Sequence, residues 1–136
     1  VIVGGLAVLA GVSIGRYVSF ASQRQWADRV DAFVRSGRTL SVRHMCPVEL
    51  RIVSQRIDLM LCGQPSGRLD IPASFAVDTS SARNAALVHI HKDGVRSFWF
   101  IPNRAMSGAI VELRDGEKVL RVIDARQAYA HEDAVP

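Results

Sequence analysis

The first fifteen residues, VIVGGLAVLAGVSIG, contain no charged side chain, whereas every later stretch of that length contains at least one. No proline separates this apolar run from the arginine-rich residues that follow, RYVSFASQRQWADRVDAFVRSGRTLSVRH. A transmembrane helix needs about 20 apolar residues to cross ~30 Å of hydrocarbon, and the run before Arg16 is shorter. Because the chain also begins with Val rather than Met, we expect residues 1–15 to be the later part of an apolar helix whose upstream part is missing.

A secretory signal peptide is the alternative interpretation of the apolar run. The apolar region of a signal peptide typically has about 7–15 residues, and Ser19-Phe20-Ala21 could serve as a small-residue cleavage site. Arg16 and Tyr17 fit this interpretation poorly, because they lie between the apolar run and that site. We therefore favour an apolar helix that continues without a break into the residues after Gly15.

Apolar and small residues recur at helical spacing after Arg16, which predicts an amphipathic helix over 16–45 with one buried stripe. The stripe consists of Trp26, Val30, Phe33, Val34, Gly37, Leu40 and Ser41. The opposite face is expected to meet water or a polar partner, and it carries Arg24, Arg29, Asp31, Arg35 and Arg38. Gly37 is expected to weaken the helix by about 1 kcal/mol relative to Ala. Pro47 is expected to end the helix.

The hydrophobic period changes from 3.6 to 2 after Pro47, which predicts β-strands over the rest of the chain, residues 46–136. Three hairpins are expected, at 48–52 with 57–61, at 87–91 with 95–101, and at 109–113 with 119–123. Short edge strands are expected at 69–71 and 75–77, within a loop-rich stretch. No crossover helix separates the strands, so the expected fold is α+β, with a long N-terminal helix packed on an antiparallel β-sheet.

Cys46 and Cys62 are the only cysteines, and an even number permits one disulfide in an oxidising compartment. The predicted hairpin pairs Val48 with Leu61, and in this register the two cysteines lie on opposite faces of the strands. A disulfide between them therefore needs a bulge or frayed strand ends. The sequence leaves both the bonded and the free state open.

The net charge of +4 comes almost wholly from arginine, and the basic residues are spread along the chain with acidic residues between them. A nucleic-acid groove needs a basic face. The linear order of the charges gives no direct sign of such a face.

No catalytic or metal-binding motif survives inspection, so we predict a protein that is not an enzyme and has no cofactor, metal or small-molecule substrate. Ser66 in the GQPSG stretch is one place too late for a G-x-S-x-G elbow, and no helix follows it. His89 and His91 share one face of a strand but lack a third ligand at a convincing spacing. The segment 131–133 (HED) is interpreted as a polar tail. Neither a P-loop nor a dinucleotide-binding fingerprint is present.

The strand expected at 95–101 carries aromatic residues on both faces. Trp99 lies on one face, and Phe98 and Phe100 lie on the other. We expect one face to pack on the helix and the other on a loop or a neighbouring subunit. Phe98 and Phe100 are the candidate partner surface.

Four stretches carry a resemblance to a known family, and they occur in the family's order. They are VIVGGLAVLAGVSIG, FVRSGRTLSVRHMCPVELRI, LDIP and FWFIPNRAMSGAIVELRDGEKVLRVI. They are similar to the family's apolar helix, its helix-to-strand passage with Pro-Val-x-Leu, its Leu-x-Leu-Pro element, and its closing pattern of Phe-x-Pro-x-Gly, Ser-Gly and two strands around an acidic-Gly turn. In this layout the chain resembles the pilin-like proteins, specifically the GspH/FimT family of minor pseudopilins and minor pilins.

The chain also departs from the family's pattern. The cleavage motif, the methylated Phe and the Glu at the family's fifth position are not in this sequence, which starts too late to include them. Asn103-Arg104 stands where a glycine turn is common, and residues 124–127 (DARQ) replace the usual Thr-Gly-Arg-Val.

The resemblance implies a minor pseudopilin of a type II secretion system, a structural subunit held in the bacterial inner membrane with its globular domain in the periplasm. It also implies partners: other pseudopilins or pilins in a hetero-oligomeric filament, inner-membrane lipid, and a secreted protein that would contact the sheet face and loops 63–84. One alternative is a minor type IV pilin with a role in pilus assembly or DNA uptake. Another is a single-pass periplasmic domain that does not polymerise.

The resemblance gives residues 1–15 two environments, lipid before assembly and the packed helices of a filament afterwards. The residues expected to serve both are Val1, Gly4, Gly5, Leu6, Leu9, Gly11, Ile14 and Gly15. Small residues allow helices to approach closely in membranes, so the four glycines are the expected points of helix contact. The alternative is that an apolar helix merely tolerates them.

Overall fold

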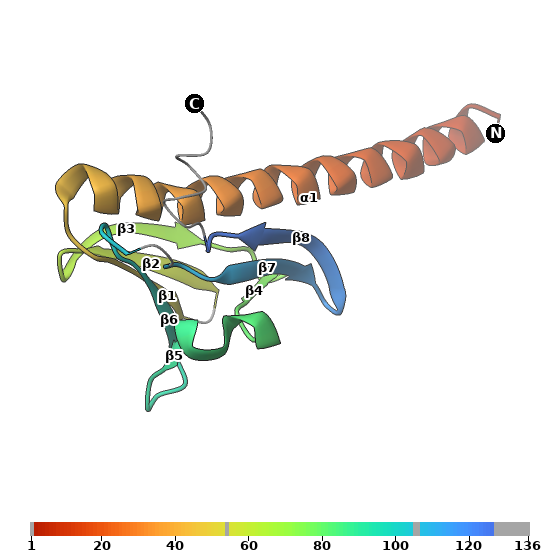
Figure 1. Cartoon of the computed structure of the whole chain (residues 1–136). Coiled ribbons are helices and arrows are strands. Elements are labelled where there is room, and N and C mark those ends of the chain that lie inside the picture. Colours follow the sequence, from red (N-terminus) through yellow and green to blue (C-terminus); the bar gives the residue numbers. More distant parts are fainter. Residues whose placement is uncertain (1, 54, 105–106, 127–136) are drawn as a thin grey trace, which may run out of the picture.

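The computed structural model describes the backbone of residues 2–53, 55–104 and 107–126, with the side chains from Phe20 onward apart from Ala82 and Ala85. Helix α1 (Ile2–His44) comes first and has 43 residues. At 1.5 Å per residue it is about 65 Å long. Its second half lies along the β-structure and its first half projects beyond it (Figure 1).

All strand pairs in the described residues are antiparallel, so the α+β prediction of a helix packed on antiparallel β-structure is confirmed. The elements after the helix are β1 (Val48–Val53), β2 (Arg56–Leu61), β3 (Gln64–Asp70), β4 (Ala76–Asp78), the 3₁₀ helix η1 (Ala82–Leu87), β5 (His89–Ile90), β6 (Arg96–Phe100), β7 (Ile110–Asp115) and β8 (Lys118–Asp124). They form two sheets rather than one. The larger has the order β3-β2-β1-β6-β5 and the smaller has the order β4-β7-β8.

The expected hairpins at 48–61 and 109–123 are present. Val48 pairs with Leu61 as predicted. The alternating pattern excludes slips by one residue, and the short connection from Val53 to Arg56 selects this register among those that remain. The remaining expectations for the strands were less accurate. Strand β3 begins at Gln64, earlier than the edge strand expected at 69. The hairpin expected at 87–91 with 95–101 is present in a shorter form, as β5 with β6, because η1 takes up the chain as far as Leu87.

The passage from β6 to β7 separates the two sheets. Gly108 donates its backbone N–H to the Trp99 carbonyl at 2.8 Å, so the chain turns back after β6 and Gly108 lies beside that strand. Its φ is +93°, and a Cβ there would overlap the carbonyl oxygen of Ala125. Glycine is needed at this position both for the positive φ and for the close approach.

The predicted buried stripe of α1 is confirmed. Val30 and Val34 are fully buried, and Trp26, Phe33 and Leu40 are partly buried against the same core. The sheets supply the other half of this core through Val48, Leu50, Ile57, Phe98, Phe100, Val111, Leu113 and Ile123.

Gly37 is the point where α1 comes closest to β6. A Cβ at this position would lie 2.7 Å from Cε2 of Phe100, well inside van der Waals contact. The sequence treated Gly37 as a weak point of the helix. The structure gives the residue a packing role that outweighs its low helix propensity.

Arg38 departs from the prediction that it lies on the polar face of the helix. Its Nη2 donates to the carbonyls of Ser107 and Ala125 at 2.8 and 3.1 Å. The guanidinium carbon also lies 5.2 Å from the centre of the Phe100 ring. Arg38 therefore connects the helix to both chain segments that flank the smaller sheet.

We predict that Gly37→Ala destabilises the protein by about 1–3 kcal/mol, the usual cost of overpacking a core. Alanine is ordinarily a better helix former than glycine, so helix propensity alone would make the variant more stable. A loss of stability therefore reports the close contact of residue 37 with Phe100. Chemical unfolding followed by circular dichroism measures it.

Thr39→Ala is the matched control, because Thr39 is exposed on the same helix. We expect its effect to stay within about 0.5 kcal/mol. A stabilised Gly37→Ala variant would contradict the close approach of α1 to β6.

Candidate functional site

The candidate site is the surface where α1 leaves the sheets, which we call the junction surface. It consists of Phe20, Arg24, Lys118, Val119 and Leu120. These residues line a groove of about 460 Å³ together with Gln23, Ala27 and Arg121. Phe20 is 67% exposed and Val119 is 38% exposed. Large apolar side chains that are grouped and exposed are typical of interaction sites.

Polar contacts hold the two sides of this groove together. Arg121 of β8 lies 2.6 Å from the Asp28 carboxylate on α1, and Gln23 Nε2 lies 3.5 Å from Asp115. Arg24 and Lys118 make no hydrogen bond or ion pair with the residues that the structure describes. The junction surface is therefore apolar at its centre, with two cations available at its rim.

The helix-packing residues predicted from the sequence lie in the projecting half of α1. The structure describes only the backbone for most of them, namely Gly4, Gly5, Leu6, Leu9, Gly11, Ile14 and Gly15. Val1 lies wholly outside the described residues. Their backbone from residue 2 onward is helical and continuous with the docked half. The packing role of these residues stays a prediction.

The candidate partner surface at Phe98 and Phe100 is wrong. Both side chains are fully buried, and their rings pack edge to face with centres 5.6 Å apart. They face α1, because this is the side of β6 that the helix covers. Trp99, which points to the other side, is the exposed aromatic residue of the strand at 42%.

A polar cluster lies on the outer face of the larger sheet, around the buried carboxylate of Glu49. Arg51 Nε donates to Glu49 Oε1 at 2.9 Å. His91 Nε2 lies 2.9 Å from Ser97 Oγ and 3.6 Å from Glu49 Oε2.

The residue types in this cluster match a Ser-His-Glu triad, but the geometry does not. In a triad the serine and the acid contact different ring nitrogens, whereas here both lie near Nε2 of His91. Ser97 is also buried, with 1% exposure, so its hydroxyl cannot reach a substrate. The cluster therefore fits a structural role on the sheet.

The two histidines of the β5–β6 hairpin lie together, as the strand pattern predicted. The ring centres of His89 and His91 are 4.6 Å apart. No group of three or more metal-ligating side chains occurs within the described part of the chain. The segment 131–133 lies outside that part.

Cys46 and Cys62 form a disulfide, with Cα atoms 5.5 Å apart. Both residues lie beyond the last strand pair, Val48 with Leu61, where the strand faces no longer constrain them. Cys62 has a φ of +54° and donates its N–H to the Pro47 carbonyl at 3.1 Å. The frayed strand ends that the sequence required for this bond are thus present, and the bond ties the end of α1 to the β2–β3 turn.

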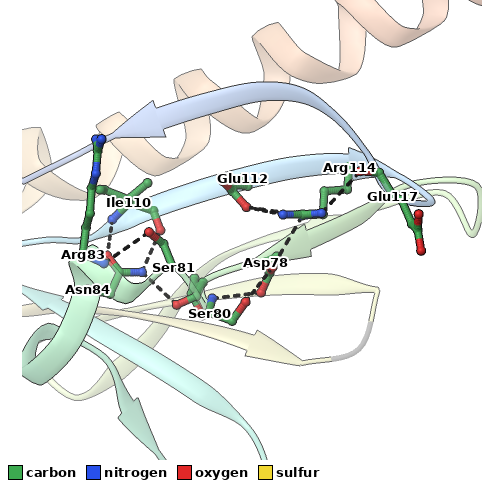
Figure 2. A network of polar contacts seen from close by, with 10 residues as sticks. Asp78, Ser80, Ser81, Arg83, Asn84, Ile110, Glu112, Arg114 and Glu117 are labelled. Carbon is green, nitrogen blue, oxygen red and sulfur yellow. Dashed lines mark hydrogen bonds and ion pairs between the residues drawn. The ribbon is translucent and has the colours of Figure 1, made fainter.

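A network of polar contacts joins β4, η1 and β7 on the side away from the helix (Figure 2). Asn84 donates to the carbonyls of Thr79 and Ile110 at 2.8 and 3.0 Å and accepts from the Ile110 N–H at 2.7 Å. Asn84 is buried, and these bonds satisfy both ends of its amide. The network holds the short edge strand β4 against β7.

Asp78 is the charged centre of this network. Burial alone would raise the pKa of its carboxyl group. The hydroxyl and the N–H of Ser80 both donate to the carboxylate, and with the nearby Arg114 and Arg96 they hold the pKa below its ordinary value. The ionised form of Asp78 therefore stabilises the fold.

No protein-family model, curated protein or solved structure matches this chain. The pilin-like resemblance rests on the stretches quoted above. Among the described residues, no helix contains a segment long and apolar enough to cross a bilayer.

We predict that Asp78→Asn makes stability less sensitive to acid. Because the pKa of Asp78 is lower in the folded than in the unfolded state, its contribution is present above the unfolded value of about 3.9 and is lost as the pH falls through the folded value. The variant should be less stable than the parent at neutral pH, by about 1 kcal/mol. The difference in stability between the parent and the variant should disappear at low pH.

Thermal unfolding measured from about pH 2 to about pH 7, which covers the titration of carboxylates, tests both the lower stability at neutral pH and its disappearance in acid. Asp70→Asn is the control, because among the described residues the Asp70 side chain pairs only with the exposed Arg68. A gap that stays constant with pH would contradict the assigned contacts of Asp78.

We predict that replacing both Cys46 and Cys62 with serine lowers the free energy of unfolding by about 2–4 kcal/mol, as expected for a loop of this size. The two cysteines are 16 residues apart. Guanidinium unfolding with and without a reductant measures the loss. The reductant should destabilise the parent protein and leave the double variant unchanged, and a parent that ignores the reductant would contradict the bond.

Proposed function

We propose that this chain is a minor pseudopilin, a non-enzymatic subunit of a type II secretion pseudopilus. In this proposal the apolar half of α1 anchors the subunit in the inner membrane, with the globular domain in the periplasm. The subunit then enters the filament near its tip, beside other pilin-like subunits. One observation carries the proposal: a single helix is packed on the sheets along one half only.

Among the elements that the structure describes, none lies alongside the projecting half of α1 (Figure 1). Residues 2–15 are uncharged, and burial of apolar surface is worth about 25 cal/mol per Å². A helix of this composition needs either lipid or other helices around it. Membrane storage followed by assembly provides both in turn.

The docked half gives this arrangement its rigidity. Val30 and Val34 are buried under the sheets, and Arg38 bonds to two chain segments beside the smaller sheet. Because the helix is continuous between the halves, a displacement of the projecting half moves the globular domain with it. Extraction of the helix from lipid can thereby deliver the whole subunit to a filament.

The junction surface is the part of the domain that such neighbours would contact first. It lies where the projecting half begins, and Phe20 and Val119 are exposed there. A neighbouring subunit whose helix runs beside α1 would cover both side chains. The two cations at the rim, Arg24 and Lys118, favour neighbours that carry carboxylates at this level.

We predict that Phe20→Asp lowers incorporation into the filament at least about fivefold, because a single charge in an apolar contact costs about 1 kcal/mol or more. The fold should survive, since the side chain is 67% exposed. The measurement is the amount of subunit that co-purifies with other pilin-like subunits from cells that assemble a pseudopilus. The full-length gene product is used.

Ile90→Asp is the matched control, because Ile90 is also an exposed apolar residue but lies on β5, in the sheet edge far from α1. It should incorporate normally. A photo-crosslinker at position 20 should capture other pilin-like subunits. If the protein inserts into the membrane but forms no crosslink to another pilin-like subunit, the alternative of a single-pass periplasmic domain that does not polymerise is favoured. DNA binding that weakens steeply with salt would favour the alternative of a minor type IV pilin.

A further inference from the structure

The two histidines of the β5–β6 hairpin lie together at one edge of the larger sheet, and we call them the histidine pair. His89 pairs with Ser97 of β6, so its side chain lies on the same face of the sheet as Ser97, away from α1. The ring centres of His89 and His91 are 4.6 Å apart, and the ring planes are nearly perpendicular, at 87°. His89 is exposed and His91 is half-buried, so a small solute can reach both rings.

The surroundings of His91 determine which of its ring nitrogens is available to a ligand. Nε2 lies 2.9 Å from Ser97 Oγ and 3.6 Å from Glu49 Oε2. Because a carboxylate can only accept hydrogen bonds, Glu49 favours the ring form that carries the proton on Nε2. Nδ1 then keeps its lone pair, and it makes no hydrogen bond within the described part of the chain. His91 therefore presents Nδ1 as an available donor of electrons to a metal ion.

Glu49 is itself held in place. The residue is only 3% exposed, and its other oxygen, Oε1, accepts a hydrogen bond from Arg51 Nε at 2.9 Å. In metal sites a histidine ligand usually has its second ring nitrogen next to a carboxylate, which fixes the ring and makes the ligand nitrogen more basic. The buried carboxylate beside Nε2 thus distinguishes His91 from an ordinary surface histidine.

His89 supplies a second ring at a suitable distance. Neither of its ring nitrogens makes a hydrogen bond with a residue that the structure describes, so the exposed side chain can turn. Two imidazoles bound to one metal ion at about 2.0–2.1 Å, with an angle of about 90–110° between them, have ring centres roughly 4.5–5.2 Å apart. The observed separation of 4.6 Å lies within this range. One metal ion can therefore contact both rings without a change in the backbone.

The ligand atoms select the class of metal ion. Imidazole nitrogen suits Cu²⁺, Ni²⁺ and Zn²⁺, whereas Mg²⁺ and Ca²⁺ prefer oxygen ligands. Among the described side chains no third metal ligand joins the pair, so water completes the coordination. The general order of affinity among these divalent ions places Cu²⁺ first.

The charges around the histidine pair are compatible with a bound cation. The charge of Arg51 is offset by Glu49, with which it forms an ion pair. Lys92 and Asp93, in the turn that follows His91, carry opposite charges. Arg96 pairs with Ile90, so its side chain lies on the opposite face of the sheet from His89.

We propose that His89 and His91 bind a divalent transition-metal ion, with Cu²⁺ bound most tightly. The ligands are Nδ1 of His91 and one ring nitrogen of His89. Glu49 and Ser97 are positioning residues, because they contact Nε2 of His91 and not the metal. The inference goes beyond the proposed assembly role and does not depend on it, because it concerns only one edge of the larger sheet.

The test titrates the full chain with Cu²⁺ and measures the affinity by calorimetry and the ligands by electron paramagnetic resonance. His89→Ala and His91→Ala should each weaken binding at least about tenfold, because even the loss of an outer partner costs about 10–100-fold. His44→Ala is the matched control, since His44 is an exposed histidine at the end of α1, and it should leave the affinity unchanged. Equal affinity in the parent and in His89→Ala, or a spectrum without two nitrogen ligands, would overturn the inference.

A second measurement separates positioning by Glu49 from a purely structural role. Nitrogen-15 NMR of the metal-free parent should show the His91 proton on Nε2, and Glu49→Gln should increase the share of the form with the proton on Nδ1. The same variant should bind Cu²⁺ roughly tenfold more weakly, at the lower end of the usual effect, because 3.6 Å is longer than a hydrogen bond. A parent that carries the His91 proton on Nδ1 would overturn the inference. If Glu49→Gln does not fold, the test with His89→Ala still decides, because His89 is exposed and its replacement leaves the fold intact.

Discussion

The close contact of α1 with β6 at Gly37 and Phe100 determines how the rest of the molecule is arranged. Because residue 37 has no Cβ, the helix backbone lies against the Phe100 ring, and the next residue, Arg38, is carried down to the carbonyls of Ser107 and Ala125. A helix held farther away could not make these bonds. One stretch of helix therefore holds together the two sheets, which share no strand ladder among the described residues.

Docking along one half of the helix places two surfaces of different chemistry at its ends. Phe20 and Arg43 are separated by about 35 Å along the helix axis, at 1.5 Å per residue. The junction surface at Phe20 is apolar with a mixed rim and adjoins the projecting half. The other end, at Arg43, lies beside Ala125, which directly follows β8.

Much of the fold could be predicted from hydrophobic period, and less of the candidate site. The 3.6 period identified the stripe through Val30 and Val34, and the period of 2 set the pairing of Val48 with Leu61. A period of 2 separates the two faces of β6 but does not say which face the helix covers, so Phe98 and Phe100 were assigned to a partner. The junction surface was not predicted because Phe20 and Val119 are 99 positions apart in the chain. The sequence did place an aromatic residue, Phe20, shortly after the apolar run, and this was a usable signal for one side of the surface.

The sequence by itself determined the buried stripe of the helix, the register of the β1–β2 hairpin and the charge-free start of the helix at residues 2–15, because each depends on residues close to one another in the chain. Tertiary structure decided the split into two sheets, the burial of Phe98 and Phe100, the inward position of Arg38 and the bond between Cys46 and Cys62. These features depend on distances between segments that are far apart in sequence. Such distances are set by how closely side chains can pack, and no local pattern encodes them.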